Sequence, residues 1–322
     1  MKKIFLFASA VIAMLAAGSC QKENSLKDGD VAEVTFNIGI PTELSTKAIG
    51  DGTTATKLYY SVFNQDKTAP IKSLAQKEVV TLVGKETKLP MKLVRNYTYT
   101  LVFWAQHEAE GVDSPYTFDP ATGVVKVSYK GNANDETRDA FCEVCTITVP
   151  DEATFSKTVT LRRPFAQINF GTDDFADITE LNLDMESTVA ISGLADTYDI
   201  LKGKVSGSAS TEFKPTVVPA QFNPAETLEV GTTEYGYVSM NYILAPVNEY
   251  DTDGNVIVKQ TDLSKVTATF TYNNEDVVIE VDNVPYQRNF RTNIIGSLFT
   301  SDVEVKIVVD PEFHKPDSEV KL

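Results

Sequence analysis

Apolar and polar residues alternate along much of this chain. Near the N-terminus, Val34, Phe36, Ile38 and Ile40 are separated by single polar or small residues, and Pro41 follows them. A spacing of two places all these side chains on one face of a β-strand, so the pattern predicts a strand with one buried face. The same alternation recurs at Tyr97, Tyr99, Leu101 and Phe103, at Val125, Val127 and Tyr129, at Leu181, Leu183 and Met185, and at Val303, Val305, Ile307 and Val309.

The clearest local signal is a β-hairpin near residue 273. Alternating apolar residues over 266–272 run into the polar tetrapeptide 273–276, and the alternation resumes over 277–281. No long stretch has the spacing of three and four residues that an amphipathic helix requires. Short β-branched and aromatic segments, divided by Gly, Asn, Asp and Pro, predict an all-β protein built from antiparallel β-sandwiches with little helix.

The start of the chain differs from the rest. Two lysines, an uncharged stretch over 4–17 and two small residues precede Cys20. This stretch is too short to span a bilayer, which takes about 20 residues, so residues 1–19 are expected to be a cleaved signal peptide. The segment before Cys20 resembles a bacterial lipobox. That resemblance implies that the Cys20 thiol carries lipid, including palmitate, and anchors the protein in the outer membrane at the cell surface.

Length and charge set the broad class. The chain has 322 residues and a formal net charge of −16. Without residues 1–19 it has 303, with 27 basic against 45 acidic side chains and a charge of −18. So acidic a surface repels nucleic-acid phosphates, and no nucleic-acid partner is expected. The length predicts two β-sandwich domains, over 31–160 and 161–322, preceded by a lipid-anchored tether over 20–30.

Two of the three cysteines, Cys142 and Cys145, form a Cys-x-x-Cys motif. A redox site places this motif at a helix N-terminus, and a structural zinc site needs a second such pair. The surrounding segment has the pattern of a strand instead, in which residues three apart face opposite ways. Two separately packed thiols are therefore favoured. A disulfide in a distorted turn and a catalytic role are the alternatives.

Other candidate chemistry is sparse. The two histidines, His107 and His314, stand outside any recognisable nucleophile motif and are interpreted as exposed loop residues. Segment 251–255 has a hint of a calcium loop but lacks its third acidic position and closing Glu, so a turn explains it better. We predict no catalytic residue, no metal site and no cofactor. A hydrolase with paired carboxylates stays a third, unsupported class.

Trp104 and Tyr116 raise a different possibility. Exposed aromatic rings at a loop end form stacking platforms for sugars. The alternative is that both rings pack in the core. Coplanar, exposed rings on a shallow cleft would favour sugar binding, whereas burial would favour packing.

Four further segments matter for their order along the chain. They are YTYTLVFWAQ at 97–106, NDETRDAF at 134–141, LRRPFAQINF at 161–170, and YQRNFRTNIIG at 286–296 followed by DPEF at 310–313. In this order, and with the lipobox, they resemble the fimbrillin-like surface lipoproteins of gut and oral Gram-negative anaerobes. The nearest subgroup is known mainly as a domain of unknown function. The resemblance covers nearly the whole mature chain.

The resemblance implies two transthyretin-like β-sandwiches and assembly into a fimbrium, or pilus, used in cell adhesion. In members that polymerise, a protease cuts after a basic residue, the first strand leaves, and a strand from another subunit fills the groove. The matching position is Lys47 before Ala48, where the family commonly has Arg. The strand that would leave spans 31–40, with Val34, Phe36, Ile38 and Ile40 as its apolar face. The donor candidate spans 303–309, with Val303, Val305, Ile307 and Val309.

The sequence therefore predicts a non-enzymatic, lipid-anchored outer-surface protein that acts as a fimbrial subunit or an adhesin. Its expected partners are other fimbrial subunits and a host or bacterial surface ligand that no motif identifies. The alternative interpretation is a glycan-binding surface lipoprotein of a polysaccharide uptake system, which has the same compartment and the same β architecture.

Overall fold

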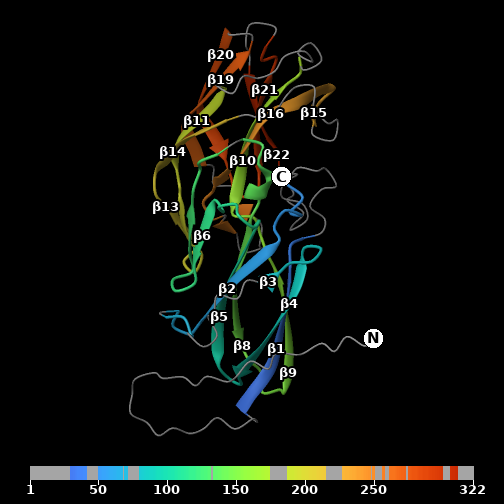
Figure 1. Ribbon diagram of the computed structural model, residues 1–322, viewed down its shortest axis with the longest axis vertical. Helices are drawn as coiled ribbons and strands as arrows, with labels where there is room; N and C mark the ends of the chain where they lie inside the picture. The colour runs from blue at the N-terminus through green and yellow to red at the C-terminus, as the bar shows by residue number, and fades with distance from the viewer. Residues whose placement is uncertain are drawn as a thin grey trace.

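The computed structural model of this chain is an elongated all-β molecule (Figure 1). Its described part contains no α-helix and one short 3-10 helix, Glu136–Arg138, so the predicted all-β fold is confirmed. The structure describes residues 30–41, 50–67, 69–71, 80–131, 133–174, 187–214, 227–247, 249–250, 256–257, 261–272, 275–299 and 305–310.

The strands nearer the N-terminus form a β-sandwich. They are β1 (Val31–Gly39), β2 (Lys57–Phe63), β3 (Val80–Thr81), β4 (Glu86–Val94), β5 (Thr98–Gln106), β8 (Phe141–Thr148) and β9 (Thr154–Thr160). One sheet has the order β4-β1-β9 and the other has the order β3-β2-β5-β8. Buried apolar side chains from both sheets, among them Phe36, Val62 and Phe103, form a common core, which we call the N-terminal core.

A second sandwich follows. It consists of β10 (Phe165–Thr172), β11 (Thr188–Leu194), β14 (Ala209–Phe213), β15 (Thr227–Val230), β16 (Thr233–Leu244), β19 (Thr261–Tyr272), β20 (Glu275–Tyr286), β21 (Arg291–Gly296) and β22 (Val305–Asp310). Its sheets have the orders β15-β16-β10-β21-β22 and β14-β11-β19-β20. Phe170, Phe270 and Ile294 belong to the core between them, the C-terminal core.

A further sheet joins the two halves of the chain. It contains β6 (Tyr116–Asp119), β7 (Val124–Val127), β12 (Thr197–Asp199) and β13 (Lys204–Ser206) in the order β13-β12-β7-β6. β7 pairs antiparallel with β12, with Val125 opposite Tyr198. This sheet therefore spans the boundary expected near residue 160. Two short strands, β17 (Glu249–Tyr250) and β18 (Val256–Ile257), pair with each other.

β1 lies in the centre of its sheet. It pairs antiparallel with β4 along its whole length and parallel with β9 from Glu33 onward. Val34, Phe36 and Ile38 face the core and are at most 1% exposed. The predicted strand with one buried face is confirmed, and both of its edges carry backbone hydrogen bonds.

β5 differs from its predicted pattern. Alternation at Tyr99, Leu101 and Phe103 predicted one buried face, but Trp104 on the other face is also fully buried. Phe103 belongs to the N-terminal core, whereas Trp104 belongs to the C-terminal core. β5 therefore lies between two cores, which local alternation does not reveal. Tyr97, expected on the buried face, precedes the strand and is 42% exposed.

The hairpin prediction is confirmed. β19 and β20 pair antiparallel up to Tyr272 opposite Glu275, so residues 273 and 274 connect them. β22 lies at the edge of the five-stranded sheet and pairs with β21. The strand predicted over 181–185 lies outside the described residues.

Phe36→Ala is expected to lower the free energy of unfolding by about 3–5 kcal/mol, because it leaves a cavity under a central strand. Glu33→Ala, at an exposed position of the same strand, is the matched control and should change it by less than about 0.5 kcal/mol. Urea denaturation of both purified variants measures the difference. Equal effects of the two substitutions would contradict the view that the inner face of β1 stabilises the sandwich.

Candidate functional site

A buried ion pair lies where the two sandwiches meet. Arg163 stands in the connection between β9 and β10, and Asp139 directly follows the 3-10 helix. Nε of Arg163 donates to Oδ1 of Asp139 at 2.5 Å, and Nη2 donates to Oδ2 at 2.7 Å. The two side chains are 0% and 1% exposed. A charge pair this deeply buried is favourable only when further hydrogen bonds satisfy its remaining polar atoms.

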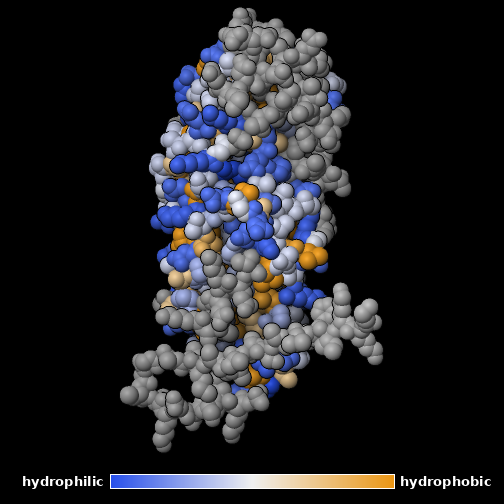
Figure 2. Space-filling model, viewed as in Figure 1, coloured by the Kyte–Doolittle hydropathy of each residue, from blue (hydrophilic) through white to orange (hydrophobic). Residues whose placement is uncertain are grey.

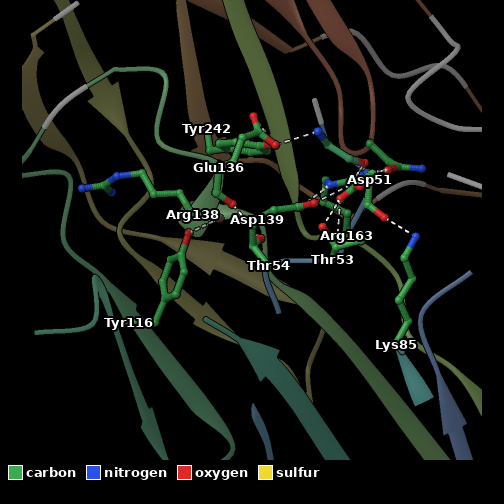
Figure 3. Close-up of polar contacts among 12 residues, drawn as sticks. Asp51, Thr53, Thr54, Lys85, Tyr116, Glu136, Arg138, Asp139, Arg163 and Tyr242 are labelled. Carbon is green, nitrogen blue, oxygen red and sulfur yellow. Dashed lines mark hydrogen bonds and ion pairs between the residues drawn. The ribbon is translucent and has the colours of Figure 1, made fainter. Parts of the chain in front are cut away.

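Arg163 makes those further bonds to distant parts of the chain. Its Nη1 donates to Oδ1 of Asn289 at 2.9 Å, and its Nη2 donates to the carbonyl oxygen of Gly50 at 2.7 Å. Its guanidinium carbon lies 4.9 Å from the ring centroid of Phe141. One guanidinium thus connects the chain before β2, the start of β8 and the loop after β20 (Figure 3).

Glu136 holds the same glycine from the other side. The amide of Gly50 donates to Oε2 of Glu136 at 2.7 Å, and the hydroxyl of Tyr242 donates to the same carboxylate. Thr54 donates its hydroxyl to the carbonyl oxygen of Glu136. Gly50 has a φ of 68°, in the left-handed region that glycine adopts without a Cβ clash. Gly50, Glu136, Asp139 and Arg163 are called the Gly50 clamp below.

Local structure positions each member of the clamp. Asp135 caps the 3-10 helix by accepting from the amide of Thr137, which fixes Glu136 in the first turn. Backbone hydrogen bonds in both directions between Cys142 and Arg162 fix the backbone next to Arg163. Lys85, directly before β4, donates to the carbonyl oxygen of Asp51, so the turn that leads into β4 also contacts this segment (Figure 3).

Burial, and after it the neighbouring Asp139 carboxylate, raise the pKa of Glu136 from 4.5 to about 7. The bonds from Gly50 and Tyr242 and the charge of Arg163 oppose this rise. The carboxyl of Glu136 therefore changes its charge near neutral pH. Because the clamp groups bind one another and several backbone segments, the arrangement holds chain segments together.

The two cysteines of the Cys-x-x-Cys motif are free, buried thiols. Cys142 belongs to the C-terminal core and Cys145 to the N-terminal core, so the strand places them on opposite faces. This agrees with separately packed thiols. Burial raises the pKa of Cys142 to about 12 and also raises the pKa of Cys145, which keeps both thiols protonated and poorly nucleophilic.

Trp104 and Tyr116 are buried, at 0% and 5% exposed. Their ring centroids are 5.4 Å apart in an edge-to-face arrangement. Nε1 of Trp104 donates to Gln106, and the hydroxyl of Tyr116 donates to the carbonyl oxygen of Arg138. Neither ring presents a face to solvent, as sugar stacking requires, so the glycan-binding interpretation loses the residues that motivated it.

The residues of the proposed strand exchange differ in what the structure describes. Ile40 is 2% exposed, like the rest of the apolar face of β1. On β22, Val305 is half-buried, whereas Ile307 and Val309 are 37% and 43% exposed. The remaining predicted positions lie outside the described residues: Cys20, Lys47, Ala48, Val303, His314 and segment 251–255.

His107 is partly buried, and its Nδ1 lies 3.0 Å from the carbonyl oxygen of Thr54. Within the described ranges, no group of three or more His, Cys, Asp or Glu side chains is placed to hold a metal ion. No described helix is long and apolar enough to cross a membrane.

Sequence reasoning did not identify the Gly50 clamp. Glu136, Asp139 and Arg163 lie in two of the segments that carried the family resemblance, but nothing local indicates that they meet. A usable signal was the arginine pair before Pro164, since one arginine next to a buried strand requires a partner. The partner, 24 residues away, follows only from the three-dimensional fold.

Several bacterial proteins of solved structure are similar to this chain. A candidate adhesin from Bacteroides thetaiotaomicron is 12% identical over 86% of this chain and 96% of that one, with a TM-score of 0.50. The fimbrial anchor protein Mfa2 from Porphyromonas gingivalis is 12% identical over 87% of this chain and 97% of that one, with a TM-score of 0.43. The tip fimbrial protein Mfa3 from the same organism, with a C-terminal truncation, is 11% identical over 87% of this chain and 99% of that one, with a TM-score of 0.43. The expected all-β sandwich fold is confirmed.

The chain belongs to the family of unknown function DUF6562, whose model matches residues 27–321. The match includes both sandwiches and agrees with the expected subgroup. No curated protein matches the chain.

Asp139→Ala is expected to lower the free energy of unfolding by about 3–5 kcal/mol, because it leaves the buried Arg163 without its carboxylate. Asp151→Ala is the matched control. It breaks the pair with Arg95, in which the Asp151 side chain is 75% exposed, and should cost less than about 1 kcal/mol. Chemical denaturation measures both. An Asp139→Ala protein as stable as the control would refute the structural role of the pair.

Glu136→Gln is expected to remove a pH dependence of stability. Between pH 4.5, the ordinary pKa of this carboxyl, and its raised pKa of about 7, the folded protein holds a proton that the unfolded chain releases. Raising the pH through this window therefore lowers the free energy of unfolding. The loss is about 2 kcal/mol, since residual solvent contact weakens the full effect of about 3 kcal/mol.

Urea denaturation of the wild type and of Glu136→Gln at about pH 5 and about pH 8 measures this contribution. Gln keeps an acceptor for the Gly50 amide but does not titrate, so the other ionisable groups cancel in the comparison. If both proteins lose the same stability between the two pH values, Glu136 is not the titrating group.

Proposed function

We propose that this protein is a non-enzymatic fimbrial subunit or adhesin of the outer bacterial surface, held there by lipid on Cys20. The observation that carries the proposal is the central, doubly paired position of β1 in a fimbrillin-like sandwich. The similar solved structures, a candidate adhesin and fimbrial proteins, support a role at the cell surface. The buried, protonated state of the two thiols supports a role without covalent catalysis.

Assembly proceeds by exchange of β1 after cleavage at Lys47. Release of β1 unpairs the facing edges of β4 and β9 and uncovers the apolar surface that Val34, Phe36 and Ile38 contact. An incoming strand with alternating apolar side chains restores the backbone hydrogen bonds of both neighbours. Because β4 and β9 run antiparallel to each other, an incoming strand pairs parallel with one of them and antiparallel with the other, as β1 does.

The Gly50 clamp supports this assignment of the cleavage position. Lys47 lies between β1, which ends at Gly39, and Gly50, which is bound through both its amide and its carbonyl group. A cut between these points separates β1 from a segment that the clamp continues to hold. The remainder of the chain then keeps the junction between its two sandwiches.

The donor is the C-terminal segment 303–309. Its described part, β22, is an edge strand, bonded on one side to β21. Ile307 and Val309 are partly exposed, so their apolar side chains are available to fill the groove of a neighbouring subunit. An edge strand with exposed apolar residues is also an aggregation hazard, which the chain's net charge of −16 reduces.

Protein shed from cells is expected to begin at Ala48 and to form a ladder of multimers on native sizing. Lys47→Gln should block the cut and leave a lipidated monomer, whereas Lys67→Gln, at an exposed lysine of the turn after β2, should behave as the wild type. N-terminal analysis and native gels read both outcomes. A wild-type protein that begins at Cys20 and migrates as a monomer would overturn strand exchange.

A further inference from the structure

A groove runs across the outer face of the β14-β11-β19 part of the C-terminal sandwich. Its volume is about 760 Å³, within the roughly 300–1,000 Å³ typical of small-ligand sites. Figure 2 shows hydrophilic residues along the flank on which Figure 1 places β11 and β14. The lining includes Lys130, Ser192, Ser210, Glu212, Lys214 and Lys265.

Small side chains make this face hollow. Ala190 and Ser192 on β11 and Ser210 on β14 point away from the core, opposite to the buried Val189. Ala190 pairs with Glu212 on one side and with Thr267 on the other, so strand pairing on both sides holds the floor of the groove at this position. The backbone polar groups of the floor are therefore bonded to neighbouring strands, and its side chains are the groups available to a ligand.

Lysines surround this floor in a protein that is otherwise strongly acidic. Three lysines and one glutamate line the groove, although the whole chain carries a net charge of −16. Lys265 pairs with Glu280 at 2.6 Å. In the described part of the chain, Lys130 and Lys214 have no recorded ion pair, and both are exposed.

The backbones of these two lysines are fixed. The carbonyl oxygen of Lys130 accepts from Nη2 of Arg138, and the carbonyl oxygen of Lys214 accepts from the amide of Ala133 at 2.8 Å. Thr211 donates its hydroxyl to the carbonyl oxygen of Tyr129, which holds the segment before Lys130 against β14. The roots of both side chains are thus held at the same rim.

We propose that this groove binds a negatively charged saccharide, such as a uronic-acid or sulfated glycan. Lys130 and Lys214 bind its carboxylate or sulfate groups. Ser192, Ser210 and Glu212 exchange hydrogen bonds with its ring hydroxyls. The glutamate accepts from hydroxyl donors, which a sugar has and a simple inorganic anion lacks.

The lining favours this ligand over two others. A neutral sugar is bound chiefly by aromatic stacking, and none of the lining residues is aromatic. An acidic peptide bound by strand addition needs an unpaired strand edge, whereas β11, at the floor of the groove, is paired on both sides. The edge of this sheet is β14, and a strand added there would extend the sheet beside the groove rather than lie across its floor. A sugar ring with several hydroxyl groups and one negative charge matches a groove lined by serine, glutamate and lysine side chains.

This site is independent of subunit assembly. It involves neither β1 nor β22, and it lies in the C-terminal half of the molecule with part of its rim from Lys130. A failure of strand exchange would leave it untouched, and its own failure would leave the assembly proposal standing. If both hold, the groove supplies the ligand-binding part of an adhesin.

Binding of the full chain to heparin, chondroitin sulfate and polygalacturonate, with dextran as the neutral comparison, tests the proposal. We expect at least one anionic glycan to bind more tightly than dextran and to bind more weakly as salt is added. The double variant Lys130→Gln, Lys214→Gln should weaken that binding about tenfold. The variant Lys88→Gln, Lys92→Gln removes the same charge from exposed positions of β4 and should bind as the wild type.

A second variant tests shape without changing charge. Ala190→Phe fills the hollow from an outward-facing strand position that tolerates an aromatic residue, and it should also weaken binding. The proposal is overturned if no anionic glycan binds, if dextran binds equally well, or if the groove and β4 variants lose binding equally. Preferential binding of poly-glutamate would identify an acidic peptide as the ligand and would also overturn it.

Discussion

The junction between the two sandwiches depends on one buried guanidinium, that of Arg163. Removing Arg163 and Asp139 from water costs several kcal/mol for each charge, and only a complete set of hydrogen bonds offsets that cost. The bonds come from Asp139, Asn289 and Gly50, which lie far apart in the sequence. The requirement therefore fixes the relative position of three chain segments. A hydrophobic contact at the same place would tolerate sliding, whereas these bonds do not.

The same constraint distinguishes the segment at Gly50 from β1, the strand that we propose is exchanged. Gly50 is tied to the junction through Glu136 and Arg163. β1 precedes this point and is held by its two backbone ladders and the contacts of its apolar face. These are interactions that any strand of suitable pattern reproduces. The molecule thus combines a sequence-specific polar lock with a generic strand groove, and the boundary between them falls in the segment that contains Lys47.

Local pattern predicted the elements whose environment is simple. β1 and the β19–β20 hairpin have one face in one core, so a period of two identified them. The burial of both faces of β5 was not predicted, because Trp104 faces a second core. That core depends on strands more than a hundred residues later in the chain. The Gly50 clamp was not predicted either, because charged residues in a sequence ordinarily indicate exposure to solvent. The groove was not predicted because Lys130, Lys214 and Lys265 come together only when β14 and β19 flank β11.

The net charge of the chain does not describe the local charge at every part of its surface. A charge of −16 spread over the chain disfavours anionic partners and self-association alike. Within about 8 Å at physiological salt, however, local groups decide what a surface attracts. The lysines of the groove are therefore an exception that the remaining surface makes selective. In the proposed site a polyanion is held where Lys130 and Lys214 flank hydroxyl side chains, and the net negative charge of the chain opposes binding of polyanions to the acidic parts of the surface.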